Sequence, residues 1–171
     1  RRQRQMCIRD RFYITLPFRV DPNPPKAESA KPEQAASIKG AHILLVEDNE
    51  LNMEISQYIL EGAGAIVAQA WNGKEAVRRF SESEPGTFDC ILMDVMMPLM
   101  DGLEATRTIR AMQRPDAATI PIVAMTANTF SEDEQRSREA GMNLFLNKPV
   151  DSGKMLQTVL ECLKMGGENA L

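Results

Sequence analysis

Only three cysteines occur in the 171 residues of this sequence, and no two of them have the CxxC spacing of a metal or redox motif. Cys7, Cys90 and Cys162 therefore argue against a zinc site and favour a reducing compartment. Long hydrophobic runs are missing too: none approaches the roughly 20 apolar residues of a membrane-spanning helix, and none has the pattern of a signal peptide. We expect a cytoplasmic location, with no membrane contact by this stretch of chain.

A basic face is also missing, although the net charge of −4 is unevenly distributed. Five arginines and one aspartate give residues 1–11 a net charge of +4, which leaves −8 on residues 12–171. Nucleic-acid binding needs a basic surface, so an acidic body with one basic end argues against nucleic acid as a partner.

The apolar residues that are present, 43% of the total, suffice for the core of one domain with additional segments. Residues 1–20 are rich in arginine and then apolar. Residues 21–39 hold four prolines and no apolar periodicity, which is typical of a linker. From residue 41 onward, apolar runs alternate with amphipathic stretches, and the folded domain is expected there.

The alternation predicts five strands and five helices. Short continuous apolar runs, such as HILLV at 42–46, are typical of strands buried on both faces. In the first amphipathic stretch, Leu51, Ile55 and Ile59 recur at i, i+4 and i+8, as on the apolar face of a helix. A strict alternation implies an α/β fold, a (βα)5 doubly wound, five-stranded parallel sheet. The expected strands are 42–46, 65–70, 88–94, 121–125 and 143–147, and the expected helices are 50–62, 73–82, 103–113, 131–140 and 151–164.

Polar side chains stand at the points where four of these strands end. Glu47 and Asp48 follow the first strand, Asp94 ends the third, Thr126 follows the fourth and Lys148 follows the fifth. The active site of such a sheet lies at the carboxyl ends of its strands, so these groups are expected to converge. Crowded carboxylates repel one another unless a cation lies among them, and Mg²⁺ takes oxygen ligands. The set suits a transferred phosphoryl group, with an aspartate as nucleophile and with metal and lysine neutralising the phosphoryl oxygens.

Each of these residues also has a simpler explanation. Asp48 or Asn49 can cap the following helix, Lys148-Pro149 can lie in an ordinary loop, and Thr126 can cap a turn. The functional interpretation is preferred because four different strand ends each carry a residue type that the chemistry needs.

Four segments resemble the motifs of one known family, in that family's order and spacing. They are ILLVEDNELN at 43–52, ILMDVMMPLMDG at 91–102, IVAMTAN at 122–128 and LFLNKPV at 144–150. Over roughly residues 41–165 the sequence is similar to the receiver domains of two-component response regulators. The resemblance implies a flavodoxin-like fold and a domain that accepts a phosphoryl group from phosphohistidine.

The resemblance assigns the acceptor and the metal ligands. It implies that Asp94 is the phosphoacceptor and that Mg²⁺ is the cofactor. It also implies that Glu47, Asp48 and Asp94 bind this ion through their side chains and Met96 through its backbone carbonyl. The only histidine, His42, opens a strand and is expected to be structural, so the phosphoryl group must come from a partner.

The resemblance also assigns the residues that respond to phosphorylation. It implies that Lys148 pairs with the phosphoryl group, that Thr126 donates a hydrogen bond to it in the active state, and that the small Ala127 leaves access. Phe145 occupies the position of the switch aromatic, where many relatives have tyrosine. The face formed by the fourth helix, the fifth strand and the fifth helix is expected to change with phosphorylation.

The motifs are most similar to the receivers of hybrid histidine kinases. FYITLPF at 12–18 resembles the last strand of the kinase ATP-binding domain, whereas MCIRDR at 6–11 resembles a translated sequencing adaptor. The nucleotide-binding boxes of that kinase domain do not occur here, so this chain is not expected to bind ATP in that way. No enzyme activity is expected of it beyond assisting its own phosphorylation and dephosphorylation, while its parent is expected to be a protein-histidine kinase. The expected segments are an assembly artefact at 1–11, a kinase-strand remnant at 12–20, a linker at 21–39, the receiver at 40–165 and a tail at 166–171, with residues 1–40 contributing nothing to the core.

The expected partner is the dimerisation and phosphotransfer domain of a histidine kinase, or a histidine phosphotransfer protein. A stand-alone response regulator is the alternative. An aspartyl-nucleophile phosphatase would need a general acid two residues after Asp94, where Met96 stands. A degenerate interaction module would not need the complete set of site residues.

Overall fold

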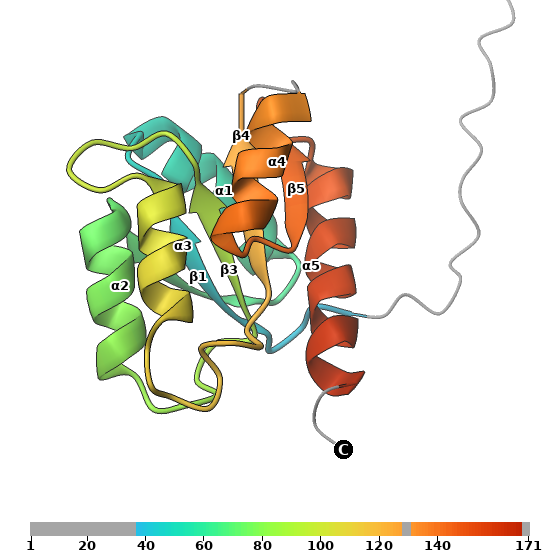
Figure 1. Ribbon diagram of the computed structural model, residues 1–171. Coiled ribbons are helices and arrows are strands. Elements are labelled where there is room, and N and C mark those ends of the chain that lie inside the picture. The colour runs from blue at the N-terminus through green and yellow to red at the C-terminus, as the bar shows by residue number, and fades with distance from the viewer. Residues whose placement is uncertain (1–36, 128–130, 169–171) are drawn as a thin grey trace, which may run out of the picture. The chain divides into compact units, whose positions relative to one another are not determined.

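The structure is a computed structural model that describes residues 37–127 and 131–168 (Figure 1). The predicted artefact, the kinase-strand remnant, most of the linker and the end of the tail lie outside the described residues. The strands are β1 (His42–Val46), β2 (Ile66–Ala70), β3 (Cys90–Asp94), β4 (Ile122–Thr126) and β5 (Leu144–Asn147). The helices are α1 (Glu50–Gly62), α2 (Gly73–Glu82), α3 (Gly102–Arg110), α4 (Ser131–Ala140) and α5 (Ser152–Glu168).

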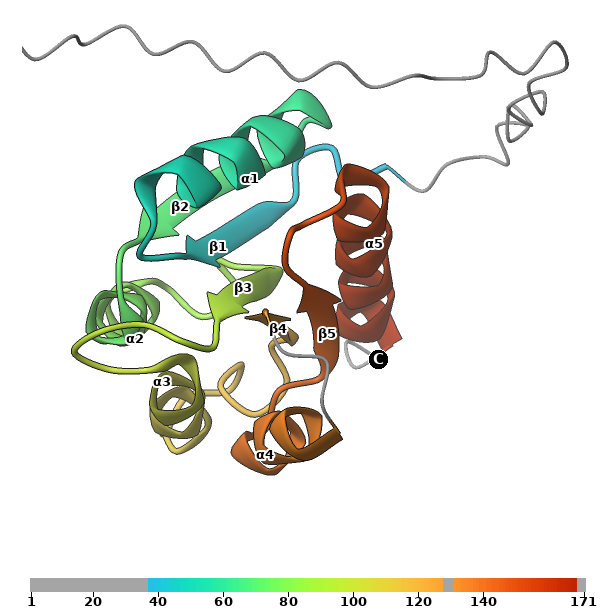
Figure 2. The ribbon, with the colours of Figure 1, turned by 90° about the horizontal axis from the view of Figure 1, so that it is seen from above.

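The five strands form one parallel sheet in the order β2-β1-β3-β4-β5. Figure 2 shows α1 and α5 on one face of this sheet and α2, α3 and α4 on the other. The predicted (βα)5 doubly wound fold is therefore confirmed. Because the strands are parallel, all of their carboxyl ends lie at the same edge of the sheet.

The core has two parts, one on each face of the sheet. Along β1 the side chains alternate: Ile43 and Leu45 pack with α1 and α5, whereas Leu44 and Val46 pack with the helices of the other face. All residues of β3 and β4 are buried, as the apolar runs predicted, while the edge strands β2 and β5 are partly exposed. The sheet is thus a rigid support for residues that follow its central strands.

Helix α1 buries a different face from the one that the sequence indicated. Its buried residues are Met53, Ser56 and Leu60, whereas Leu51 is 63% and Ile55 is 47% exposed. Ile59, the third residue of the predicted apolar stripe, packs at the margin of the core. The prediction was wrong for Leu51 and Ile55 because α1 has apolar residues on two sides, and the sheet lies against the side that carries Met53 and Leu60.

The folded part also extends beyond the predicted limits at both ends. Ile38 is 3% exposed and packs in the core with α1 and α5, so the expectation that residues 1–40 contribute nothing to the core is wrong for this residue. Helix α5 continues to Glu168, into the predicted tail, whereas α3 ends at Arg110 and not at 113. Within 37–127 and 131–168, no helix is both long enough and apolar enough to cross a membrane.

Candidate functional site

The carboxyl edge of the sheet collects residues from both halves of the sequence. Glu47 and Asp48 follow β1, Asp94 is the last residue of β3, Thr126 is the last of β4, and Lys148 follows β5. Strands β1, β3, β4 and β5 are consecutive neighbours in the sheet. Residues that are far apart in the sequence therefore lie at adjacent strand ends.

Three carboxylates form the centre of this edge. Glu47, Asp48 and Asp94 each offer an oxygen atom, and these oxygens lie within 4.8 Å of one another. Glu47 is 1% and Asp94 is 5% exposed, whereas Asp48 is open to solvent. An all-oxygen set with one accessible member fits a hard divalent cation such as Mg²⁺, which keeps several waters when bound.

Asn49, not Asp48, caps helix α1. The side-chain oxygen of Asn49 accepts a hydrogen bond from the backbone N–H of Asn52 at 3.1 Å, and this bond satisfies one of the amides at the start of the helix. The simpler explanation of Asp48 as a helix cap does not hold. Its carboxylate lies instead beside those of Glu47 and Asp94.

Helix α3 begins directly against Asp94. A Cβ atom on Gly102 would overlap the backbone oxygen of Asp94, so only glycine fits at this point. The amide of Gly102 donates to the carbonyl of Val95 at 3.0 Å, which folds the intervening loop back onto the end of β3. Gly102 thus shapes the site by allowing α3 to begin against the end of β3.

Lys148 joins two of the carboxylates. Its Nζ donates to Oε2 of Glu47 at 2.5 Å and to Oδ2 of Asp94 at 2.7 Å. The backbone amide of Lys148 donates to the carbonyl of Thr126 at 2.8 Å, which fixes the start of the lysine side chain beside the end of β4. In this arrangement the lysine neutralises part of the carboxylate charge.

The environment of these groups shifts their protonation equilibria. Burial raises the pKa of Asp94, and the hydrogen bond from Lys148 opposes this shift only in part. For Lys148, burial acts to lower the pKa, but the hydrogen bonds to Asp94 and Glu47 outweigh it and the pKa is raised. Lys148 is therefore charged at neutral pH, and a second source of positive charge would ease the burial of the carboxylates.

The loop after β3 contributes a backbone group and one wall of a cavity. The amide of Met96 donates to Oδ1 of Asp94 at 3.1 Å, while the Met96 side chain is 77% exposed. Thr126 is 6% exposed and lines, with Ala127 and Met96, a cavity of about 340 Å³ that also touches Arg136 of α4. This cavity connects the carboxyl edge of the sheet with α4.

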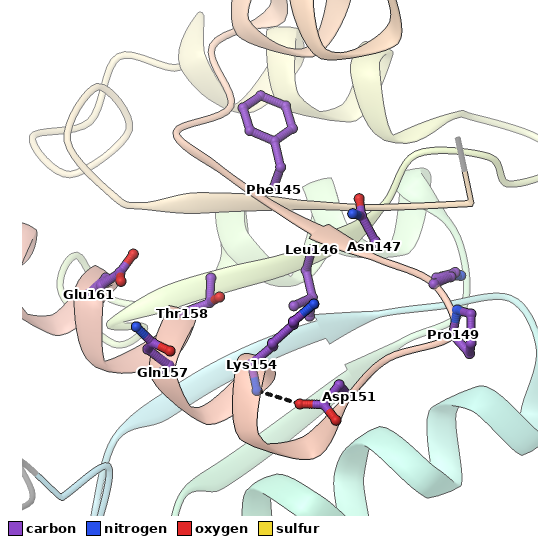
Figure 3. A pocket seen from close by; sticks show the side chains of 10 residues that line it. Phe145, Leu146, Asn147, Pro149, Asp151, Lys154, Gln157, Thr158 and Glu161 are labelled. Carbon is purple, nitrogen blue, oxygen red and sulfur yellow. Dashed lines mark hydrogen bonds between the residues drawn. The ribbon is translucent and has the colours of Figure 1, made fainter. Parts of the chain in front are cut away.

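Phe145 lies on β5, on the sheet face that α4 covers. Its ring packs against the core of that face, and the guanidinium of Arg138 stands 4.8 Å from the ring centroid. Figure 3 shows Phe145 pointing away from Gln157, Thr158 and Glu161, which line a cavity of about 350 Å³ between β5 and α5. Unlike the acidic residues, Phe145 is not in the centre of the site, and its partly buried ring packs beside Arg138 of α4.

One contact of the site was not predicted from the sequence. The amide nitrogen Nδ2 of Asn52 donates to Oε1 of Glu47 at 3.0 Å. Asn52 belongs to the segment ILLVEDNELN that carried the resemblance, and its position three residues after the helix cap was the only available signal.

A parallel (βα)5 sheet that gathers three carboxylates, a threonine and a lysine at its carboxyl edge is the arrangement that the sequence resemblance to receiver domains implied. Residues 43–160 match the family described as the response regulator receiver domain. The chain belongs to this family.

The similar proteins include histidine kinases and receiver domains of sensor histidine kinases. Histidine kinase 1 of Arabidopsis thaliana is 34% identical over an alignment of 158 residues, and the match covers 75% of this chain and 13% of that protein. The chain thus spans a small part of this curated relative. The receiver domain of sensor histidine kinase PA1611 from Pseudomonas aeruginosa, with a magnesium ion coordinated in its active-site cleft, is 35% identical with a TM-score of 0.66, covering 73% of this chain and 98% of that one.

A third similarity involves a structure of a complex. It is the co-crystal structure of the Saccharomyces cerevisiae histidine phosphotransfer signaling protein Ypd1 and the receiver domain of its downstream response regulator Ssk1. A chain of that complex is 30% identical to this one with a TM-score of 0.66, and the match covers 78% of this chain and 93% of that chain.

Proposed function

We propose that this chain accepts a phosphoryl group from a phosphohistidine onto Asp94. A carboxylate oxygen of Asp94 attacks phosphorus, the new O–P bond forms, and the P–N bond to the donor imidazole breaks. The imidazole leaves with the electron pair of that bond and takes up a proton. The observation that carries the proposal is the Asp94 carboxylate, which accepts a bond from Lys148 and lies beside the carboxylates of Glu47 and Asp48 at the carboxyl edge of the sheet.

Mg²⁺ is the proposed cofactor. The side chains of Glu47, Asp48 and Asp94, with the backbone carbonyl of Met96, would hold the ion. The close carboxylate oxygens support this assignment, as does the magnesium in the cleft of the similar receiver from Pseudomonas aeruginosa. When bound, the ion supplies positive charge for the phosphoryl oxygens and for the crowded carboxylates.

Lys148 and Thr126 are proposed to stabilise the phosphorylated state. The ammonium group of Lys148, now bound to Asp94 and Glu47, would donate to a phosphoryl oxygen. Thr126 would donate its hydroxyl group, with the small Ala127 leaving room for the phosphoryl group. Movement of Thr126 would free space for Phe145 to turn inward and thereby change the face of α4, β5 and α5.

The proposed phosphodonor is a histidine phosphotransfer protein or the corresponding domain of a kinase. A group of exposed apolar side chains around the acceptor edge supports docking of a protein rather than of a small molecule. These residues are Leu51, Ile55, Trp71, Met96 and Leu99. The similar receiver in the complex with Ypd1 is consistent with the same class of partner.

We further propose that the chain is a cytoplasmic fragment of a hybrid sensor histidine kinase. The similarity to such kinases supports this origin. A stand-alone response regulator is the alternative, and the uninterrupted gene upstream of residue 12 distinguishes the two. Catalysis by this chain would be limited to assisting its own phosphorylation and dephosphorylation.

Mass spectrometry under mild conditions tests the acceptor. The full chain, given Mg²⁺ and a phosphorylated histidine phosphotransfer protein, is expected to gain the mass of one phosphoryl group, and Asp94→Asn to gain none. Asp89→Asn is the matched control, because Asp89 precedes the same strand at its opposite end, where it accepts a bond from the backbone of His42. Equal labelling of wild type and Asp94→Asn would exclude Asp94 as the acceptor.

A further inference from the structure

Glu47 is held from two sides by donors of different character. Its Oε1 accepts a hydrogen bond from the neutral amide of Asn52 at 3.0 Å, and its Oε2 accepts from the charged ammonium of Lys148 at 2.5 Å. Glu47 is 1% exposed, so water contributes little to its solvation. Its buried carboxylate therefore depends on these protein donors for hydrogen bonds.

The backbone of Asn52 is held in place by the first turn of α1. Its backbone N–H is bound by the cap residue Asn49, and the next residue, Met53, is fully buried and donates its amide to the carbonyl of Asn49 at 2.9 Å. The side chain of Asn52 therefore starts from a rigid first turn of α1 and reaches back to Glu47. It also lines, with Glu47 and Lys148, a small cavity of about 140 Å³ between α1 and the segment after β5.

The two donors respond differently to an arriving cation. Lys148 carries a positive charge next to the oxygens that the cation needs, so the two compete for the same carboxylates. The amide of Asn52 is neutral, and it binds the other oxygen of Glu47. The Asn52 bond can persist when Lys148 releases Glu47, and it then remains as the contact that orients the carboxylate.

We propose that Asn52 is a positioning residue that keeps Glu47 oriented in the acidic cluster while Lys148 is exchanged for the divalent cation. This inference rests on the proposed magnesium site. Partners that orient a metal-binding carboxylate commonly change metal affinity about 10-fold or more when they are removed. The contribution of Asn52 is to the affinity for Mg²⁺ and not to the transfer step at Asp94.

Calorimetric titration of the full chain with Mg²⁺ tests the proposal. Asn52→Leu, which keeps the size but removes the donor, is expected to raise the Kd about tenfold. Gln57→Leu is the matched control, because Gln57 on the same helix donates a similar bond at 2.8 Å to Glu61, away from the cluster. The Kd of this control variant for Mg²⁺ is expected to stay unchanged. Asn52→Ser, too short to reach Glu47, is expected to behave as Asn52→Leu does and serves if the leucine variant does not fold.

Phosphorylation kinetics with acetyl phosphate separate positioning from general damage. The Mg²⁺ concentration for half-maximal rate is expected to rise about tenfold in the Asn52 variants, while the rate at saturating Mg²⁺ stays near that of wild type. An unchanged Kd, or a lower maximal rate at an unchanged half-maximal concentration, would overturn the role of Asn52. Failure of wild type itself to bind Mg²⁺ or to be phosphorylated would instead reject the proposed function.

Discussion

Replacement of Lys148 by methionine removes the only cation that contacts the acidic cluster among the described residues. Glu47 and Asp94 would then lie close together with their charges uncompensated, at side-chain exposures of 2% and 7%. Methionine has a similar length and apolar stem, so the change is mainly one of charge. We expect Lys148→Met to destabilise the protein without metal.

The magnitude follows from the burial of the three groups. Breaking a fully buried pair costs about 3–5 kcal/mol because a charge is left without a partner. The Lys148 side chain is 17% exposed, and Asp94 can take up a proton, so we expect a smaller loss of about 2–3 kcal/mol at neutral pH. Lys154→Met, at an exposed lysine of α5, is the control and is expected to leave stability unchanged.

The pH dependence of the loss has a definite sign. Burial raises the pKa of Asp94 in the folded protein above its value in the unfolded chain, so folding takes up protons between these two pKa values. The stability that this proton uptake provides is lost as pH rises through the folded-state pKa. Removal of Lys148 raises this pKa further because the opposing hydrogen bond disappears. The deficit of Lys148→Met is therefore expected to be largest at neutral pH and to shrink toward acidic pH.

Urea denaturation followed by circular dichroism measures the loss, at several pH values and with or without millimolar Mg²⁺. The deficit is also expected to shrink with Mg²⁺, because the ion replaces the missing positive charge. Equal stability of Lys148→Met and Lys154→Met at neutral pH, or a deficit that neither acid nor Mg²⁺ reduces, would refute the electrostatic argument.

Two further predictions concern the N-terminal boundary and the switch. A chain that begins at Gly40 is expected to be about 2 kcal/mol less stable in urea than one that begins at Ala35, because it lacks the buried Ile38; equal stability would contradict this. Thr126→Ala is expected to accept the phosphoryl group, since the acceptor carboxylate and the lysine remain, but to couple it weakly to the face of α4, β5 and α5. NMR with beryllofluoride as phosphoryl mimic should show smaller shifts there than in wild type, and shifts of equal size would exclude Thr126 as the link.

Signals within short stretches of sequence sufficed to predict the fold. Continuous apolar runs marked β1, β3 and β4 because a strand buried on both faces needs apolar residues at every position. The alternation with helical stretches then implied a parallel sheet, and a parallel sheet puts all of its strand ends at one edge. This is why the candidate residues could be selected before any distance was known.

Periodicity alone did not show which side of a helix faces the sheet. The residues Leu51 and Ile55 are as apolar as the buried Met53 and Leu60, but they are exposed beside the acceptor edge. A helix with apolar residues on two sides has two possible orientations, and the choice depends on the strands that it packs against. Similarly, nothing in the linker-like composition before residue 40 indicated that Ile38 would fill a gap in the core.

The sequence by itself determined which chemical groups end the strands: three carboxylates, a threonine and a lysine, in an order that fixes their place at one edge of a parallel sheet. Only the tertiary structure decided how these groups pair. Lys148 binds Glu47 across 101 positions of sequence, Asn52 binds the other oxygen of Glu47, and Asn49 rather than Asp48 caps α1. Such pairings depend on distances of a few ångströms between elements that are remote in the chain, and packing of the whole sheet and its helices sets these distances.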